Sequence, residues 1–300
     1  MKILLLGKDG QVGSELQRSL LPLGELIAIG RRELDLTDLT ALAALLITLT
    51  PDIIVNAAAY TNVDNAEEER AAAFLLNAEM VNTLAEYAQK SGSMLVHYST
   101  DYVFDGKAPS AYVETDPVNP QNIYGLSKLA GEQAIVASDC NFLIFRTSWV
   151  FSPLGNNFIK NILKFAQEKE SLAVVSDQQS SPTSAELIAD ITALAIVTYQ
   201  QGRIASGIYH LSSTGITSRH NLACYVVTHA LEQGIHFKLS LSKIMPLETL
   251  LFPQRAKRPK NSLLNTTRLS TALNMQFPNW SIDVKKVIGQ LIGEGYFNGM

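Results

Sequence analysis

The chain has 300 residues, of which 47% are hydrophobic and 17% charged, with a formal net charge of −4 and a pI near 5.8. These values indicate a globular chain with a large core and exclude a disordered one, and the acidic balance argues against a nucleic-acid partner, because nucleic-acid-binding proteins present basic faces. The length suits one large domain or two unequal domains.

The sequence also indicates the cellular compartment. No apolar stretch approaches the length that spans a bilayer, and the aliphatic run 3–6 is too short for the core of a signal peptide. Cys140 and Cys224 lie far apart in the sequence and are expected to be buried structural thiols in a reducing compartment. We therefore predict a cytoplasmic protein that does not associate with a membrane.

A glycine-rich segment, residues 7–13, directly follows the aliphatic run 2–6. A short apolar run bounded by glycine predicts a buried parallel strand, and the helical spacing of apolar residues over 12–23 predicts a helix. At such a turn, glycines let a ligand approach closely, and the helix N-terminus offers N–H groups to a pyrophosphate. The spacing G-x-x-G-x-x-G in this context predicts dinucleotide binding. The residues expected at this contact are Gly7, Gly10, Gln11, Val12 and Gly13.

A second strand, predicted over 25–30, ends at Arg31 and Arg32. At this point of a dinucleotide-binding fold an acid selects NAD, whereas an arginine accommodates the 2′-phosphate of NADP. Because two arginines stand where the acid is expected, we predict NADPH as the cofactor, with NADH also usable. A solvated basic turn is the alternative interpretation. Asp35 and Leu36, which follow, are predicted to meet the adenine.

The pattern that follows predicts a parallel sheet with helices on both faces. Further strands are expected over 52–59, 94–101, 141–150 and 172–177, and helices over 39–49, 67–90 and 183–200. Strand alternating with helix is typical of a Rossmann-type, doubly wound α/β fold. The third strand runs into Ala57, Ala58 and Ala59, whose small side chains leave room for the cofactor at the C-terminal edge of the sheet.

From about residue 178 the pattern becomes less regular. A short strand is expected over 207–211, an amphipathic helix over 217–233 and an irregular basic segment over 243–265. We therefore expect an NAD(P)-binding Rossmann domain over residues 1–170, to which the helix 183–200 returns. Residues 171–300 are expected to form mainly a smaller α/β domain that binds the substrate.

Tyr124 and Lys128 are spaced i,i+4, so they share one face of the helix predicted to run to about residue 137. A tyrosine has a pKa near 10, and a neighbouring ammonium lowers it by stabilising the phenolate. Such pairs are also common on surface helices. Thr100 ends the fourth strand and is expected to point into the same crevice. The combination predicts a catalytic site of Thr100, Tyr124 and Lys128.

Three acidic residues form a weaker pattern. Glu186 and Asp190 are spaced i,i+4 on a predicted helix, and Glu15 lies on the first helix. Three hard oxygen donors suit Mg²⁺, including at a contact between subunits. Separate solvated carboxylates are the alternative interpretation.

Several motifs together resemble the extended short-chain dehydrogenase/reductase superfamily, most closely its members that reduce dTDP-linked keto-sugars. They are Gly7-x-x-Gly10-x-x-Gly13, Asn56-Ala57-Ala58, Ser99-Thr100-Asp101-Tyr102-Val103-Phe104, Tyr124-x-x-x-Lys128 and Arg258-Pro259. The resemblance extends over nearly the whole chain. Gln179 and Ser180 depart from it, because the family often carries an aromatic residue and a glycine there.

The resemblance implies a homodimer that uses NAD(P)H to reduce the C4 ketone of a dTDP-4-keto-6-deoxy sugar. Tyr124 would donate the proton, Lys128 would lower its pKa, and Thr100 would bind the reacting oxygen. The residues implied on the substrate side are Tyr102, Phe104, Trp149, Asn157 and Arg258, with the Arg258 guanidinium on the substrate diphosphate.

Two other functions share these motifs. One is another nucleotide-sugar enzyme, an epimerase or a 4,6-dehydratase; the other is a non-catalytic regulatory subunit, such as that of methionine adenosyltransferase. Dehydratases of the superfamily place an Asp-Glu pair after the strand-four threonine, whereas Thr100 is followed here by Asp101 and Tyr102. The presence of Thr100, Tyr124 and Lys128 argues against a silent subunit.

Overall fold

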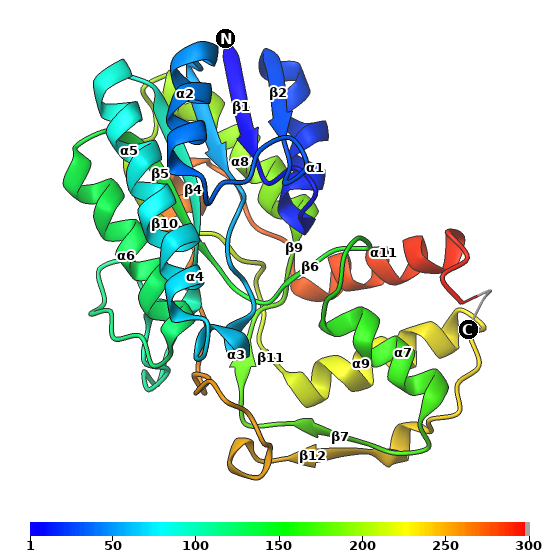
Figure 1. Cartoon of the computed structure of the whole chain (residues 1–300). Helices are drawn as coiled ribbons and strands as arrows, with labels where there is room; N and C mark the ends of the chain where they lie inside the picture. The colour runs from blue at the N-terminus through cyan, green and yellow to red at the C-terminus, as the bar shows by residue number, and fades with distance from the viewer. Residues whose placement is uncertain (298–300) are drawn as a thin grey trace.

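The computed structural model describes residues 1–297, and a six-stranded parallel sheet lies at its centre (Figure 1). The strands are β1 (Lys2–Leu6), β2 (Glu25–Ile29), β3 (Ile53–Asn56), β4 (Met94–Thr100), β5 (Asn141–Thr147) and β10 (Gly207–His210). Their order is β10-β5-β4-β3-β1-β2, and every neighbouring pair is parallel. The order reverses between β1 and β3, and open α/β sheets bind ligands outside the C-terminal strand ends at such a point. The predicted α/β fold is confirmed.

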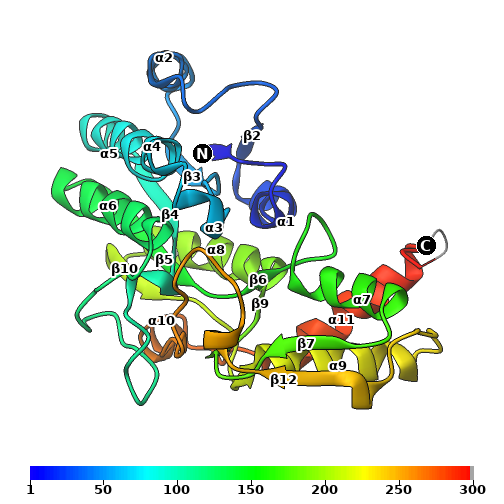
Figure 2. The same cartoon turned by 60° about the horizontal axis from the view of Figure 1, so that its bottom comes forward.

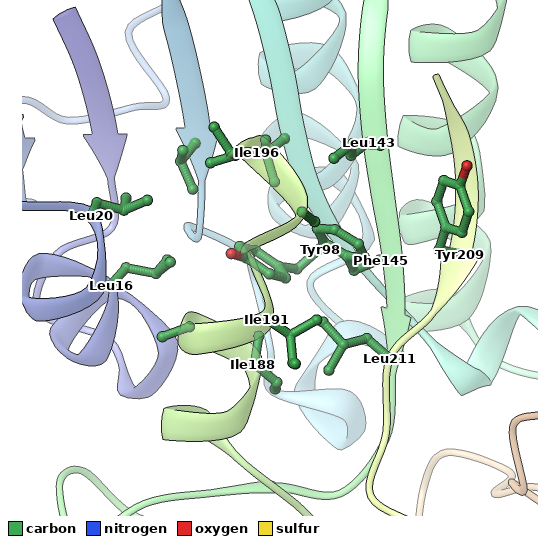
Figure 3. Close-up of a cluster of buried hydrophobic side chains, with 14 of the residues drawn as sticks. Leu16, Leu20, Tyr98, Leu143, Phe145, Ile188, Ile191, Ile196, Tyr209 and Leu211 are labelled. Atoms are coloured by element: carbon green, nitrogen blue, oxygen red, sulfur yellow. The ribbon is translucent and has the colours of Figure 1, made fainter. Parts of the chain in front are cut away.

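Helices cover both faces of this sheet (Figure 1). On one face lie α2 (Leu39–Leu49), α5 (Met80–Ser91) and α6 (Ile123–Ser138); on the other lie α1 (Gln11–Leu20) and α8 (Ala185–Gln200). Alternate side chains of a strand point to opposite faces, so Leu4 packs against the first group and Leu5 against the second. Figure 3 shows the second of these cores, in which Leu16, Ile188 and Phe145 are buried together.

Two expected strands differ from the prediction. β5 ends at Thr147 because Trp149 has a φ of +45°, which breaks the extended backbone, and only β6 (Val150–Phe151) resumes pairing, with β9 (Thr183–Ser184). β7 (Leu172–Val175) is not the sixth strand of the large sheet, because it pairs with β12 (Ile244–Leu247) instead. A four-residue apolar run predicts a strand but does not specify its partner.

The helix expected over 67–90 is also divided. A short α3 (Val63–Ala66) precedes α4 (Arg70–Phe74), which continues through a π-turn at Leu75–Glu79 into α5. The π-turn directs Asn77 inward, where its Oδ1 accepts the Tyr60 N–H at 2.8 Å and its Nδ2 donates to Ser127 Oγ at 2.9 Å. One side chain thus joins the segment after β3 to α6.

A second core lies beyond the C-terminal edge of the sheet (Figure 2). It is formed by α7 (Phe158–Glu168), α9 (Arg219–Glu232) and α11 (Trp280–Gly293) with β7 and β12. The remaining elements are β8 (Gln179–Ser180), which pairs with β11 (Thr217–Ser218), and α10 (Thr267–Ala272).

The chain passes between the two cores more than once. α7 precedes residue 170 but packs in the second core, whereas α8 and β10 follow residue 170 and complete the large sheet and its cover. The two cores therefore do not divide at a single point of the chain. Both cysteines are free; Cys140 is buried and Cys224 is partly exposed. Across residues 1–297, no helix is long and apolar enough to cross a bilayer.

Candidate active site

A cleft of about 1640 Å³ lies at the C-terminal edge of the large sheet and is lined by residues of both cores. Sites for drug-sized ligands usually have 300–1,000 Å³, so this cleft has room for two large ligands. The predicted residues that line it are Gly7, Gly10, Gln11, Val12, Arg31, Asp35, Leu36, Ala57, Ala58, Ala59, Thr100, Tyr102, Tyr124, Lys128, Trp149, Asn157 and Arg258.

Glycine is required for different physical reasons at the three positions of the first turn. Gly7 has a φ of +83°, and a Cβ on it would lie 2.7 Å from the Ala58 nitrogen. A Cβ on Gly13 would lie 2.0 Å from the Gly7 oxygen. Gly10 has an ordinary φ of −78°, and the nearest atom to its Cβ position is 3.4 Å away. The protein's own packing therefore requires Gly7 and Gly13, whereas Gly10 keeps the N-terminus of α1 open, as a bound pyrophosphate requires.

A positively charged and a negatively charged side chain lie near the end of β2. Arg31 is exposed and lines the cleft, whereas Arg32 is not among the lining residues. The Asp9 carboxylate lies against Gly30, since a Cβ built there would be 2.0 Å from its Oδ2. Asp9, on the glycine turn, thus places a carboxylate beside the end of β2. The lining by Arg31 and Asp9 fits the ribose end of a dinucleotide, where a cation meets a 2′-phosphate and an acid meets a hydroxyl.

The N-terminus of α6 brings Tyr124 to the end of β4. Asn122 caps the helix by accepting the Gly125 N–H at 2.8 Å, so Tyr124 lies in the first turn. A Cβ on Gly125 would lie 2.3 Å from the Tyr102 oxygen, which shows how closely the helix approaches the segment after Thr100. Burial raises the pKa of the Tyr124 phenol above its ordinary value of 10, and the neighbouring Thr100 hydroxyl acts in the opposite direction.

Lys128 is 2% exposed, and its Nζ lies 3.1 Å from His97 Nε2. Burial lowers the pKa of Lys128 to about 8 and that of His97 well below its ordinary value. Burial is the largest influence on the Tyr124 pKa in this structure. The lowering of this pKa by Lys128 stays a prediction.

Hydrogen bonds beneath Lys128 lead back to the cofactor side of the cleft. Asn56 Oδ1 accepts the Ala58 N–H at 3.1 Å, which leaves Asn56 Nδ2 to donate to His97 Nδ1 at 3.1 Å. Since a neutral imidazole has one donor and one acceptor nitrogen, His97 Nε2 then donates to Lys128 Nζ. This arrangement favours the neutral amine. No pattern in the sequence assigns His97 to the site, because its contact with Lys128 depends on the packing of α6 on β4.

The predicted substrate-side residues divide into two groups. Tyr102, Trp149 and Arg258 line the cleft, as does Asn157, although its Nδ2 already donates to Gln11 Oε1 at 2.9 Å and to Ser152 O at 2.7 Å. Phe104 does not line it. Its ring is 1% exposed and stacks on Tyr112 with centroids 4.2 Å apart. The assignment of Phe104 to the substrate site is therefore wrong, because its side chain completes a small core.

Arg258 already forms an ion pair within the protein, and a second arginine, which the sequence analysis did not identify, lines the same cleft. The Arg258 guanidinium forms a fork with Asp64, with nitrogen–oxygen distances of 2.7 and 3.2 Å. Arg219, the first residue of α9, lines the same cleft, and its Cζ lies 3.6 Å from the centre of the Trp149 ring. No spacing signal in the sequence identifies Arg219, because it meets Trp149 only through the contact between α9 and the β5–β6 segment.

The predicted magnesium site has no support in the structure. Glu15, Glu186 and Asp190 do converge, but on Arg18, whose nitrogens lie 4.0, 3.9 and 2.7 Å from their oxygens. Lys286 Nζ lies a further 2.6 Å from Glu186. Over the described residues, no group of three or more potential ligands is placed to hold a metal ion. Arg18 and Lys286 thus place two cations among the three carboxylates, where a metal ion would have to lie.

The fold and the cleft define the class. A parallel α/β sheet with a glycine turn at its switch point, and a Tyr-x-x-x-Lys helix beside the same cleft, is the arrangement of the short-chain dehydrogenases/reductases. Within this class, the chain belongs to the family described as the RmlD substrate binding domain, whose model matches residues 1–292.

Individual relatives agree with this assignment. The chain is 44% identical to the dTDP-4-dehydrorhamnose reductase of Shigella flexneri over 295 residues, which cover 97% of this chain and 98% of the relative. The crystal structure of a dTDP-4-dehydrorhamnose reductase from Clostridium acetobutylicum is 34% identical and matches with a TM-score of 0.87, over 97% of this chain and 100% of that one. The enzyme of the same name from Bacillus anthracis, solved in complex with NADP, is 33% identical with a TM-score of 0.86 and the same coverage.

Proposed function

We propose that this chain uses NADPH to reduce the C4 ketone of dTDP-4-dehydrorhamnose, which yields dTDP-L-rhamnose. The observation that carries the proposal is the position of Tyr124, a partly buried phenol beside Thr100 in a cleft that also contains the glycine turn. Membership of the family and the relatives' names support the choice of substrate, and the NADP complex of one relative supports the cofactor.

The residues that would hold the cofactor are the glycine turn, Ala57 to Ala59 and Arg31. Bound NADPH supplies the hydride that C4 requires. Tyr124 supplies the proton for the developing alkoxide, and its raised pKa keeps the phenol protonated at neutral pH, as a general acid requires. Thr100 orients the reacting oxygen through its hydroxyl. Lys128 lies one turn along the helix. With a pKa of about 8 it is mostly protonated at pH 7, and this ammonium would stabilise the phenolate after the proton has left.

The same geometry argues against a dehydratase. Elimination of water from a sugar needs a carboxylic acid and a carboxylate base next to the ring, and only Asp101 follows Thr100 here, with Tyr102 in the second position. Burial raises the pKa of Tyr102 above its ordinary value, so this phenol is protonated at neutral pH and cannot replace the base.

The experiment that tests the proposal measures NADPH oxidation with dTDP-4-dehydrorhamnose and, separately, the conversion of dTDP-glucose with NAD⁺. Stoichiometric NADPH oxidation with the first substrate and no product from the second are the expected results. Formation of the 4-keto-6-deoxy product at a catalytic rate would overturn the proposal. Homodimer formation, expected from the family resemblance, remains a prediction, and light scattering tests it against the chain mass of 32.8 kDa.

A further inference from the structure

Arg219 places a cation in the cleft without an acidic partner. Across residues 1–297, no carboxylate oxygen lies within 4.0 Å of its guanidinium, and it donates no hydrogen bond. Its Cζ lies 3.6 Å from the centre of the Trp149 ring and 4.9 Å from that of Phe158, so two aromatic rings contact the guanidinium. A partly desolvated cation is costly unless hydrogen bonds or an anion compensate it. The planar edge of this guanidinium is available for such a partner.

Arg258, the other arginine at this end of the cleft, has no such capacity. Its Nη2 and Nη1 bind the two oxygens of Asp64, and Nη1 also donates to Gln254 Oε1 at 2.8 Å. An anion that used Arg258 would have to compete with a fork that is already formed. Of these two arginines, Arg219 is the one without a carboxylate in contact with its guanidinium.

The surroundings of Arg219 place it on the substrate side. The charged and titratable groups that act on it are Tyr102, Asp101 and Arg258. These groups follow the end of β4 or belong to the loop after β12, whereas the cofactor pyrophosphate is expected at the N-terminus of α1. Trp149, the ring under the guanidinium, has a φ of +45°. Strained backbone of this kind persists where the surrounding structure over-determines it, and such residues cluster at ligand sites.

We propose that Arg219 binds the diphosphate of the substrate nucleotide, an inference that rests on the proposed reduction of a dTDP-sugar. A guanidinium presents parallel N–H groups that match two phosphate oxygens, and hydrogen bonds between ionised groups are about twice as strong as neutral ones. Stacking on Trp149 fixes the plane of the fork before the ligand arrives, which reduces the entropy lost on binding.

The test compares the binding of dTDP and thymidine to the NADP⁺-saturated enzyme by isothermal titration calorimetry. Arg219→Gln removes the charge, and Arg219→Lys retains it without the planar fork. Arg70→Gln is the matched control, because Arg70 also lies over an aromatic ring, that of Phe74 at 4.8 Å, but is exposed outside the cleft. Separate NADP⁺ titrations establish that each variant is folded.

Arg219→Gln should weaken dTDP binding at least tenfold and thymidine binding less than twofold. Arg219→Lys should lie between it and the wild type, and Arg70→Gln should bind both ligands like the wild type. Binding of dTDP within twofold of wild type by both Arg219 variants would overturn the inference, as would an equal loss of thymidine binding. If the wild type binds UDP but not dTDP, the proposed substrate is wrong, and the same comparison made with UDP decides the role of Arg219.

Discussion

Because Lys128 is buried, we predict that its protonated form lowers the free energy of unfolding of the wild-type protein. The pKa of Lys128 is about 8 in the folded protein, against an ordinary value of 10.5, because burial disfavours the ammonium. A difference of one in pKa is worth about 1.4 kcal/mol, so below pH 8 the protonated lysine destabilises the folded protein by about 3 kcal/mol. Between pH 8 and 10.5 the unfolded chain binds more protons than the folded one, so the free energy of unfolding rises with pH in this window.

Lys128→Met removes this pH dependence. The stability of the variant relative to wild type should be roughly 2–3 kcal/mol greater at pH 7 than at pH 10, as the linkage relation gives for these two pKa values. The unpaired His97 Nε2 left by the substitution costs roughly 1–3 kcal/mol. That cost contributes equally at both pH values, because the His97 pKa lies far below them.

Urea unfolding followed by circular dichroism at pH 7, 8, 9 and 10 measures the difference. Lys90→Met is the matched control, because Lys90 is 74% exposed on α5 and the substitution involves no buried charge. A stability difference between Lys128→Met and wild type that stays constant from pH 7 to pH 10 would refute the reasoning, since the lysine would then titrate alike in the folded and unfolded chains.

Three further predictions concern activity. Tyr124→Phe should lower kcat by about 10²–10⁴, the usual contribution of a general acid, with little change in the KM for NADPH; near-normal turnover would remove Tyr124 from the mechanism. Arg31→Ala should raise the KM for NADPH but not for NADH, while Arg32→Ala, outside the cleft lining, should change neither; equal effects of Arg31→Ala on both cofactors would contradict the assignment. Exhaustive EDTA treatment should leave activity unchanged, because Arg18 and Lys286 already form ion pairs with these carboxylates, and a loss restored by Mg²⁺ would show otherwise.

The sequence was most informative where function and backbone geometry impose local patterns. The Gly7 and Gly13 positions follow from one turn, and Tyr124 and Lys128 from one helix, so their spacing, together with the predicted strand ends beside them, was enough to indicate them. The strand ends bearing Ala57 and Thr100 could be placed because parallel strands present their C-terminal ends at one edge of the sheet.

Contacts between distant segments were out of reach. His97 meets Lys128 across the β4–α6 interface, and Arg219 meets Trp149 across 70 residues of sequence. Phe104 is the opposite case, a residue that was predicted to line the site but does not. It shares a motif with Tyr102, but after the turn at Asp101–Val103 its side chain enters a core with Tyr112. A shared motif does not determine which residues face the ligand.

The π-turn at Leu75–Glu79 makes this stretch of the chain sensitive to length rather than to composition. A π-turn is a helix with one residue more than the α-helical repeat requires, so deletion of Leu75 or Leu76 would restore a regular helix. Each residue of an α-helix turns the chain by about 100°, and the deletion would therefore rotate Asn77 out of register with Tyr60 and Ser127. A substitution at an exposed position nearby changes one contact, whereas a one-residue deletion would separate the cofactor side of the cleft from the helix that carries Tyr124. The π-turn at Leu75–Glu79 is therefore expected to tolerate insertions and deletions less well than the loops around it.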